Sequence, residues 1–222
     1  MTAPLTLFGG TFDPVHLGHL QVATEAARQA DLDKVYLLPC HIPPHKAGPH
    51  ASPAHRLAML QRVCQEWPLF AVDDRELKQH RPSYTVETLR QCREQDSHRP
   101  IIFILGMDSL KSLNTWFHWQ ELMSLCHLLV CRRGNCEEDF NLDIQALLAR
   151  HQTQDPDHLK RQPCGHILLA DTSIISQSSS QVRQALMQGN TPALLPACVL
   201  AYIQQHQLYQ GCKKTPASGR PC

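Results

Sequence analysis

Apolar and polar positions follow each other along this chain in the order typical of an α/β protein. Short apolar runs predict buried strands at residues 5–8, 34–39, 69–72, 100–105, 127–131 and 166–169. Between these runs, apolar residues recur every three or four positions, which predicts helices near residues 20–30, 53–66, 85–95, 142–150, 178–188 and 196–207. Strands that alternate with helices predict an α/β fold, with a mostly parallel sheet covered by helices on both faces.

Individual segments refine this pattern. The unbroken apolar run of residues 101–105 is expected at the centre of the parallel sheet. The second predicted helix is expected to turn one apolar face inward, formed by Leu57, Leu60 and Cys64. The charged stretch 73–80 is expected to be exposed, and the polar stretch 152–165 is expected to be a connection without regular structure.

No internal repeat or linker divides the chain, so a single domain over residues 1–210 is expected. Residues 211–222 lack periodicity, which predicts a disordered tail. No apolar run approaches the ~20 residues that cross a bilayer, so no membrane partner is expected. The first residues lead directly into the first strand without a signal peptide, and a cytoplasmic location is expected.

Charge and cysteine content narrow the classes of function. The formal net charge is +1, from 21 basic and 20 acidic residues. This balance argues against a nucleic-acid partner, because nucleic-acid-binding domains carry a basic excess. The ten cysteines include no Cys-x-x-Cys pair and are expected to be reduced thiols. Cys126, Cys131 and Cys136 are spaced by five, which does not fit a zinc site, and no protein-held metal is predicted.

The candidate chemistry begins where Gly9, Gly10 and Thr11 interrupt the first apolar run. Glycines at that point expose backbone N–H groups without side-chain bulk, and the following helix adds its dipole. Together these features favour a bound phosphate. His16 and His19 are three residues apart and are expected on one side of the first helical turn. Imidazoles placed there can donate hydrogen bonds to phosphate oxygens.

Further candidate residues follow other predicted strands. They lie in the long loop after Pro39 and in segments 106–108, 132–133 and 178–183. The carboxyl ends of parallel strands meet at one rim of a sheet, and ligands bind beyond that rim. These segments are therefore expected to form one site with the glycine loop.

Several positions around the histidines match one signature together: Gly10, Phe12, Asp13, Pro14, His16, Gly18 and His19. The stretch resembles the GxFDPxHxGH signature of the nucleotidyltransferase superfamily of adenylyl- and cytidylyltransferases. Other motifs occur in an order similar to that of the bacterial nicotinate-nucleotide adenylyltransferases. These motifs are PPHK at 43–46, PSYT at 82–85, GMDS at 106–109, TW at 115–116 and VCRR at 130–133. The resemblance covers about residues 5 to 208.

The resemblance implies a Rossmann-like nucleotidyltransferase fold and a defined reaction. Enzymes of this family transfer the adenylyl group of ATP to nicotinate mononucleotide, which gives deamido-NAD and pyrophosphate in NAD biosynthesis. The 5′-phosphate of the acceptor is already ionised, so a direct in-line displacement needs no general base. Mg²⁺ is expected to arrive on the nucleotide, because the sequence shows no dense carboxylate cluster.

The resemblance also assigns roles to individual residues. The expected catalytic residues are His16, His19 and Arg183. The expected ATP contacts are Gly9, Gly10, Thr11, Phe12, Lys46, Gly106, Asp108, Arg133 and Ser180. The expected contacts of nicotinate mononucleotide are His45, Tyr84, Thr85, Trp116 and Phe117. Among these, the Trp116 ring is expected to stack on the pyridine, and the N–H groups of Thr85 and Phe117 are expected to receive its carboxylate.

The last motif departs from the family pattern Ile-Ser-x-Thr-x-Ile-Arg. Residues 177–183 read QSSSQVR, so Ser180 keeps the hydroxyl of the usual Thr, whereas Gln177 changes the entry to the helix. Ser178 and Gln181 have the spacing of a capping box. Gly134 stands where the family usually has Pro.

Two alternatives stay open from the residues alone. One is another adenylyltransferase of the same fold, with phosphopantetheine or nicotinamide mononucleotide as the acceptor. The other is a nucleotide-binding module without turnover, which would bind ATP but release no pyrophosphate. The sequence also leaves open whether the protein forms a homo-oligomer.

Overall fold

The computed structural model describes residues 2–42, 48–79, 81–133, 139–173 and 178–210, and for Arg133 it describes the backbone only. The strands are β1 (Leu5–Gly10), β2 (Val35–Pro39), β3 (Phe70–Val72), β4 (Ile101–Gly106), β5 (His127–Arg133), β6 (Gln152–Thr153) and β7 (Ile167–Thr172). The α-helices are α1 (Leu17–Gln29), α2 (Pro53–Glu66), α3 (Thr85–Gln95), α4 (Met107–Lys111), α5 (Leu122–Leu125), α6 (Leu142–His151), α7 (His158–Arg161), α8 (Ser179–Met187) and α9 (Ala197–Gln205).

The strands form one sheet in the order β3-β2-β1-β4-β5-β7-β6, and all the described strand pairs are parallel. β1 lies between β2 and β4, so that Leu7 pairs with both Tyr36 and Phe103. The chain builds the sheet outward from β1 in one direction and then returns to add β4 on its other side. A crevice forms at such a reversal of strand order, beyond the carboxyl ends of the strands.

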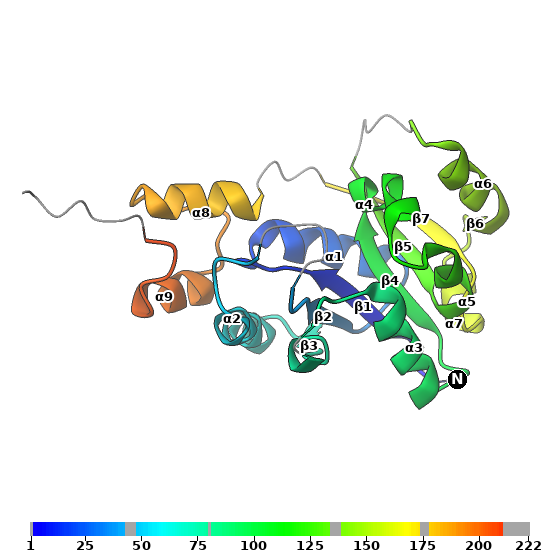
Figure 1. The fold of residues 1–222 in the computed structure, drawn as a ribbon, viewed down its shortest axis with the longest axis horizontal. Coiled ribbons are helices and arrows are strands. Elements are labelled where there is room, and N and C mark those ends of the chain that lie inside the picture. Colours follow the sequence, from blue (N-terminus) through cyan, green and yellow to red (C-terminus); the bar gives the residue numbers. More distant parts are fainter. Residues whose placement is uncertain (1, 43–47, 80, 134–138, 174–177, 211–222) are drawn as a thin grey trace, which may run out of the picture.

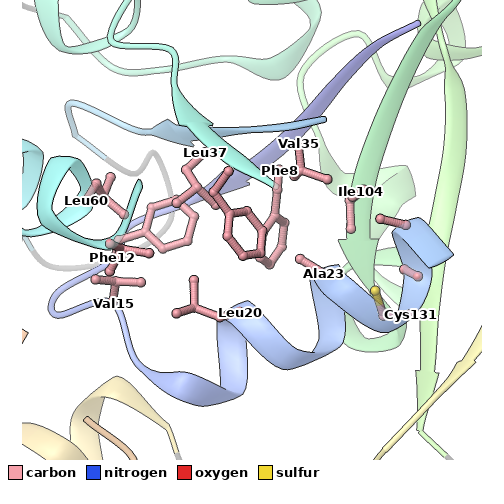
Figure 2. Packing of buried hydrophobic residues seen from close by; sticks show 14 of the residues in the cluster. Phe8, Phe12, Val15, Leu20, Ala23, Val35, Leu37, Leu60, Ile104 and Cys131 are labelled. Atoms are coloured by element: carbon pink, nitrogen blue, oxygen red, sulfur yellow. The ribbon is translucent and has the colours of Figure 1, made fainter. Parts of the chain in front are cut away.

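Alternate residues of each strand pack on opposite faces of the sheet. Phe8 and Ile104 face the cluster that α1, α2, α8 and α9 cover, whereas Leu7 and Phe103 face the cluster that α3, α4, α5 and α6 cover. Figure 2 shows the first of these clusters, where Leu20 and Ala23 of α1 lie under the strands. Helices on both faces explain why the central strands are apolar at almost every position. The predicted fold class is confirmed.

The C-terminal helices extend the layer of α1 and α2 at one end of the molecule. Figure 1 shows α8 and α9 on the side of the molecule away from the N-terminus, and α9 packs against α2. α8 begins with a capping box in which Ser178 accepts from the backbone N–H of Gln181, as predicted, and Ser52 caps α2 in the same way. These caps fix where both helices start.

Three details differ from the predictions. The inward face of α2 is Arg56, Met59, Leu60 and Val63, so only Leu60 of the predicted face is fully buried. The stretch 73–80 is not wholly exposed, because Glu76 and Leu77 are buried. The polar stretch 152–165 contains β6 and α7, which are held by a parallel pairing with β7 and by burial of Leu159. The predicted tail, residues 211–222, lies outside the described residues.

Candidate active site

A cleft of about 1350 Å³ lies beyond the carboxyl ends of β1, β2 and β4. Most of the residues that the sequence nominated line this cleft. They are Gly9, Gly10, Thr11, Phe12, His16, His19, Tyr84, Thr85, Gly106, Asp108, Trp116, Phe117, Ser180 and Arg183. Residues from four separate stretches of the chain thus meet in one cavity, as the strand pattern predicted.

Three nominated residues are not tested by this geometry. His45 and Lys46 lie outside the described residues. Arg133 ends β5, and its side chain is not described. Their proposed contacts stay predictions.

The glycines of the loop after β1 are required by close packing. A Cβ atom on Gly9 would lie 2.7 Å from Cζ of Phe103, and one on Gly10 would lie 2.9 Å from Cζ of Phe12. Both rings are buried, so neither has room to move aside. Phe12 itself has a φ of +50°, which turns the chain sharply and tucks its ring under the loop. The loop therefore presents bare backbone to the cleft.

The rings of the two histidines lie against each other at the start of α1, tilted by 33°. Their ring centroids are 3.8 Å apart, and His19 Nδ1 accepts from the backbone N–H of His16 at 3.2 Å. A neutral imidazole that accepts at Nδ1 carries its proton on Nε2. The backbone thus fixes His19 in the tautomer that can donate from Nε2. The ring also packs on Phe12, with centroids 5.2 Å apart, which holds its orientation.

Asp13 is a buried structural junction rather than a ligand for phosphate. Its carboxylate accepts from the backbone N–H groups of His50 and Ala51, at 2.7 and 3.0 Å, and from the Tyr209 hydroxyl at 2.6 Å. This bond and burial raise the pKa of Tyr209, which keeps the phenol protonated. Arg183 Nη1 lies 3.7 Å from the same carboxylate. The motif aspartate therefore ties three distant segments to the glycine loop.

Arg183 connects α8 to the glycine loop. Its Nη1 donates to the backbone carbonyl of Asp13 at 2.7 Å, and its Nη2 donates to Ser180 Oγ at 3.0 Å. Ser179 Oγ also donates to the carbonyl of Pro14 at 3.1 Å. Ser179 and Arg183 thus join the start of α8 to the first loop, and Ser180, which stands in place of the family's Thr, holds the Arg183 guanidinium.

The opposite wall of the cleft is aromatic. The rings of Tyr84 and Phe117 lie 4.8 Å apart, and Trp116 meets Phe103 edge to face at 6.4 Å. Phe117 is 46% exposed, which is unusual for so apolar a side chain. α3 starts beside this wall, and Tyr84 at its N-cap makes no side-chain cap hydrogen bond among the described residues. The wall thus combines flat rings with the N-terminal turn of a helix, where the first backbone N–H groups have no partner within the helix.

Two buried charged residues near the cleft were missed by the sequence analysis. Arg56 is fully buried and donates to the carbonyls of Thr11 and His41 at 2.8 and 3.1 Å. Glu76 lines the cleft, is 5% exposed and accepts from Thr88 Oγ1 at 2.7 Å. Burial lowers the pKa of Arg56 and raises that of Glu76. Arg56 shares a helical face with apolar residues three and four positions later, which indicates the buried side of the helix but not the carbonyls that receive the charge.

Cys40, which lines the cleft, is not an activated thiolate, and the described residues form no metal cage. Burial raises the pKa of the Cys40 thiol, which therefore stays neutral beside Thr11. Within the described ranges, no three His, Cys, Asp or Glu side chains are grouped so that they could hold a metal ion. In the same ranges, no helix is long and apolar enough to cross a membrane.

Comparison with known proteins places the chain in a family. Residues 7–185 match the cytidylyltransferase-like family. The chain is 46% identical over 211 residues to a probable nicotinate-nucleotide adenylyltransferase of Aeromonas salmonicida, covering 95% of this chain and 99% of that protein. A protein of Pectobacterium atrosepticum with the same description is 44% identical, covering 95% and 100%. The chain belongs to the nicotinate-nucleotide adenylyltransferases.

This membership makes the protein a nucleotidyltransferase of NAD biosynthesis, and the predicted family and enzyme class are confirmed. A solved structure supports the fold. Nicotinic acid mononucleotide adenylyltransferase of Plasmodium falciparum, complexed with NaAD, superposes with a TM-score of 0.70 at 16% identity, over 94% of this chain and 98% of that one. At such identity the similarity concerns the fold, and the roles of single residues rest on the geometry of the cleft.

Proposed function

We propose that this protein transfers the adenylyl group of ATP to nicotinate mononucleotide within the cleft and releases pyrophosphate. One observation carries the proposal: a bare glycine loop with paired histidines faces an aromatic wall with free helix N–H groups across one cavity. The first wall suits phosphates, and the second suits a flat ring that bears an anion. The reaction is proposed to take place in the cytoplasm.

On the nucleotide side, the loop of Gly9 to Phe12 and the start of α1 receive the phosphates of ATP. His19 donates from Nε2, and Arg183 with Ser180 approaches from α8. Asp108, at the first turn of α4, accepts from the ribose hydroxyls, as a carboxylate at a strand end does in nucleotide-binding folds. His45, Lys46 and Arg133 complete the nucleotide and acceptor contacts by the family resemblance.

On the acceptor side, Trp116 stacks on the pyridine ring, and Tyr84 and Phe117 border it. The N–H groups of Thr85 and Phe117 donate to the pyridine carboxylate. Thr85 is the first residue of α3, so the helix dipole adds to the attraction of an anion there. A nicotinamide amide presents its own N–H groups to these donors and leaves polar groups unpaired, at ~1–3 kcal/mol each.

The reaction itself needs positioning and charge neutralisation. An oxygen of the acceptor 5′-phosphate attacks the α-phosphorus of ATP, a new P–O bond forms, and the bond to the pyrophosphate oxygen breaks in line. His19 stabilises charge that develops on the phosphate oxygens by donating from Nε2. The neutral Cys40 thiol and the ionised acceptor make a covalent enzyme intermediate unnecessary.

Mg²⁺ is proposed to enter as part of the substrate, bound to the triphosphate. Of the carboxylates that line the cleft, Asp13 and Glu76 are engaged in structural hydrogen bonds, and Asp108 stands alone on α4. This donor set does not form a protein cage for a resident metal. Mg²⁺ on the phosphates would neutralise charge on the leaving pyrophosphate.

The test is pyrophosphate release from ATP and Mg²⁺ with each acceptor in turn. We expect kcat/KM for nicotinate mononucleotide to exceed that for the amide by at least ~10²-fold, with no turnover of phosphopantetheine. Equal values for acid and amide would refute the carboxylate assignment, and ATP binding without pyrophosphate release would refute catalysis.

A pair of tryptophan variants tests the stacking role. Trp116→Ala should raise KM for both pyridine acceptors, because the ring stack is common to them. Trp119→Ala is the matched control, since Trp119 packs on the same core cluster but does not line the cleft. An unchanged acceptor KM in Trp116→Ala would refute the stacking assignment.

A further inference from the structure

A series of buried polar contacts, called the polar chain below, links the two walls of the cleft. It starts at Arg56, whose side chain is fully buried in α2. Nη1 donates to the carbonyl of Thr11 at 2.8 Å, and Nη2 donates to the carbonyl of His41 at 3.1 Å. One guanidinium therefore holds the loop after β1 and the loop after β2 together.

The chain continues from His41 to the segment before α3. The His41 N–H donates to Ser83 Oγ at 3.0 Å, and the Ser83 N–H donates to the carbonyl of Ile42 at 3.2 Å. Ile42 and Pro82 also form a parallel bridge. The short segment after β2 is thus paired with the residues that precede Tyr84 and Thr85.

Glu76 closes the chain on the acceptor side. Its buried carboxylate accepts from the hydroxyl of Thr88 at 2.7 Å, in the first turn of α3. The hydroxyls of Thr88 and Ser83 both oppose the rise that burial causes in the pKa of Glu76, so Ser83, which accepts from the His41 N–H, also lies beside this carboxylate. The series of contacts leads from Thr11, on the phosphate wall, to the first turns of α3, on the aromatic wall.

A fully buried arginine destabilises the fold by desolvation of its charge, so packing alone does not explain this residue. Its helical neighbours on the same face, Met59, Leu60 and Val63, are apolar, and a residue such as Met would fill the space without burying a charge. The planar fork of a guanidinium can satisfy two carbonyls in a fixed relative position, which a lysine ammonium cannot do. The position therefore depends on the planar, two-pronged shape of the guanidinium and not only on its charge.

We propose that Arg56 is a positioning residue for adenylyl transfer, which sets the phosphate loop relative to the start of α3 through His41 and Ser83. This inference rests on the proposed function, because it assumes that the two walls hold the two reactants. An in-line reaction needs its partners aligned, and a misplacement of about 1 Å can cost ~10²-fold in rate. Neither substrate touches Arg56 in this arrangement.

The variants Arg56→Lys, Ser83→Ala and their combination test the proposal in the full-length protein. Arg56→Lys keeps the charge but loses the fork, and Ser83→Ala removes the next link. We expect each single variant to lower kcat by ~10-fold or more, with KM for ATP and for nicotinate mononucleotide within ~3-fold of the original. The double variant should lose little more than the stronger single one, because both break the same chain.

Arg62→Lys is the matched control. Arg62 lies on the same helix, with its guanidinium 4.5 Å from the centre of the Tyr202 ring, and it does not line the cleft. It should keep its kcat. Thermal melts and titration of folded active sites at the assay temperature separate rate per folded molecule from loss of fold.

A residue that only stabilises the fold would change the folded fraction but not kcat per folded molecule, and that result would overturn the proposal. Losses that multiply in the double variant would also overturn it, since they would show independent effects. If Arg56→Lys does not fold, Ser83→Ala alone decides, because it tests the same chain from the other end. An unmodified protein that turns over no nicotinate mononucleotide would instead refute the proposed function.

Discussion

Replacing His19 by alanine should separate the chemistry of the cleft from its stability. The change removes the Nε2 donor of a side chain that lines the cleft. Among the structural contacts that it also removes are the bond from the His16 N–H at 3.2 Å and the ring contacts with His16 at 3.8 Å and with Phe12 at 5.2 Å. Each contact contributes ~0.5–1.5 kcal/mol to folding.

The two effects differ enough in size to be told apart. Loss of these three contacts amounts to ~1.5–4.5 kcal/mol, which corresponds to a melting temperature lower by roughly 3–18 °C for a chain of this length. Most proteins of this kind are stable by ~5–15 kcal/mol, so the variant stays folded at 25 °C. Loss of one donor to a developing anion costs ~10²–10³-fold in kcat. The rate should therefore fall far more than the folded fraction.

The assay is steady-state pyrophosphate release at saturating ATP and nicotinate mononucleotide, beside a thermal melt. His19→Asn is the control, because its Oδ1 can still accept from the His16 N–H but no donor stands at the position of Nε2. It should recover part of the melting temperature while kcat stays low. A kcat within ~3-fold of the original in either folded variant would refute the role of His19 at the phosphates.

Two further predictions concern stability. Tyr209→Phe removes a 2.6 Å hydrogen bond to the buried Asp13 carboxylate, which should cost ~1.5–3 kcal/mol of unfolding free energy; an unchanged urea midpoint would contradict this. Burial lowers the pKa of His127 to about 4, because the enclosed ring is costly to charge, and the hydrogen bond to the Gln162 carbonyl opposes this shift only in part. The neutral His127 ring is therefore compatible with the fold above its unfolded pKa of ~6.5. As the pH falls from there toward 4, the free energy of unfolding should decrease by up to ~3 kcal/mol. In the original protein, His127 Nε2 lies 2.8 Å from the Gln162 carbonyl, and His127→Gln keeps a donor for that carbonyl but does not titrate. Urea unfolding of this variant should show a smaller loss of stability between about pH 6.5 and pH 4 than the original protein shows.

The parts of the fold that could be predicted are those that a short window of residues determines. Apolar runs mark the strands because both faces of the sheet are covered, and the capping residues Ser52 and Ser178 mark where α2 and α8 begin. The glycine loop and the histidine pair lie within a few residues of each other. Local pattern was therefore enough to place them in one site.

The parts that could not be predicted depend on contacts distant in the sequence. Arg56 is buried because carbonyls from two other loops receive it, and nothing within its own helix indicates those partners. Glu76 lies in a charged stretch that suggested exposure, yet the hydroxyl of Thr88 on α3 makes its burial tolerable. β6 is a strand because β7 pairs with it, although its own two residues carry little preference.

The bond between Asp13 and Tyr209 spans 196 positions, and it has a consequence for how the protein is made. During synthesis, the glycine loop and its histidines emerge first, while the phenol that holds the motif carboxylate is added near the end. Contacts of such long sequence separation form late in folding. A chain that stops between residues 19 and 209 would carry the whole nucleotide signature and still lack this bond. Its Asp13 carboxylate would be left with the backbone N–H groups of His50 and Ala51, where the chain reaches that far.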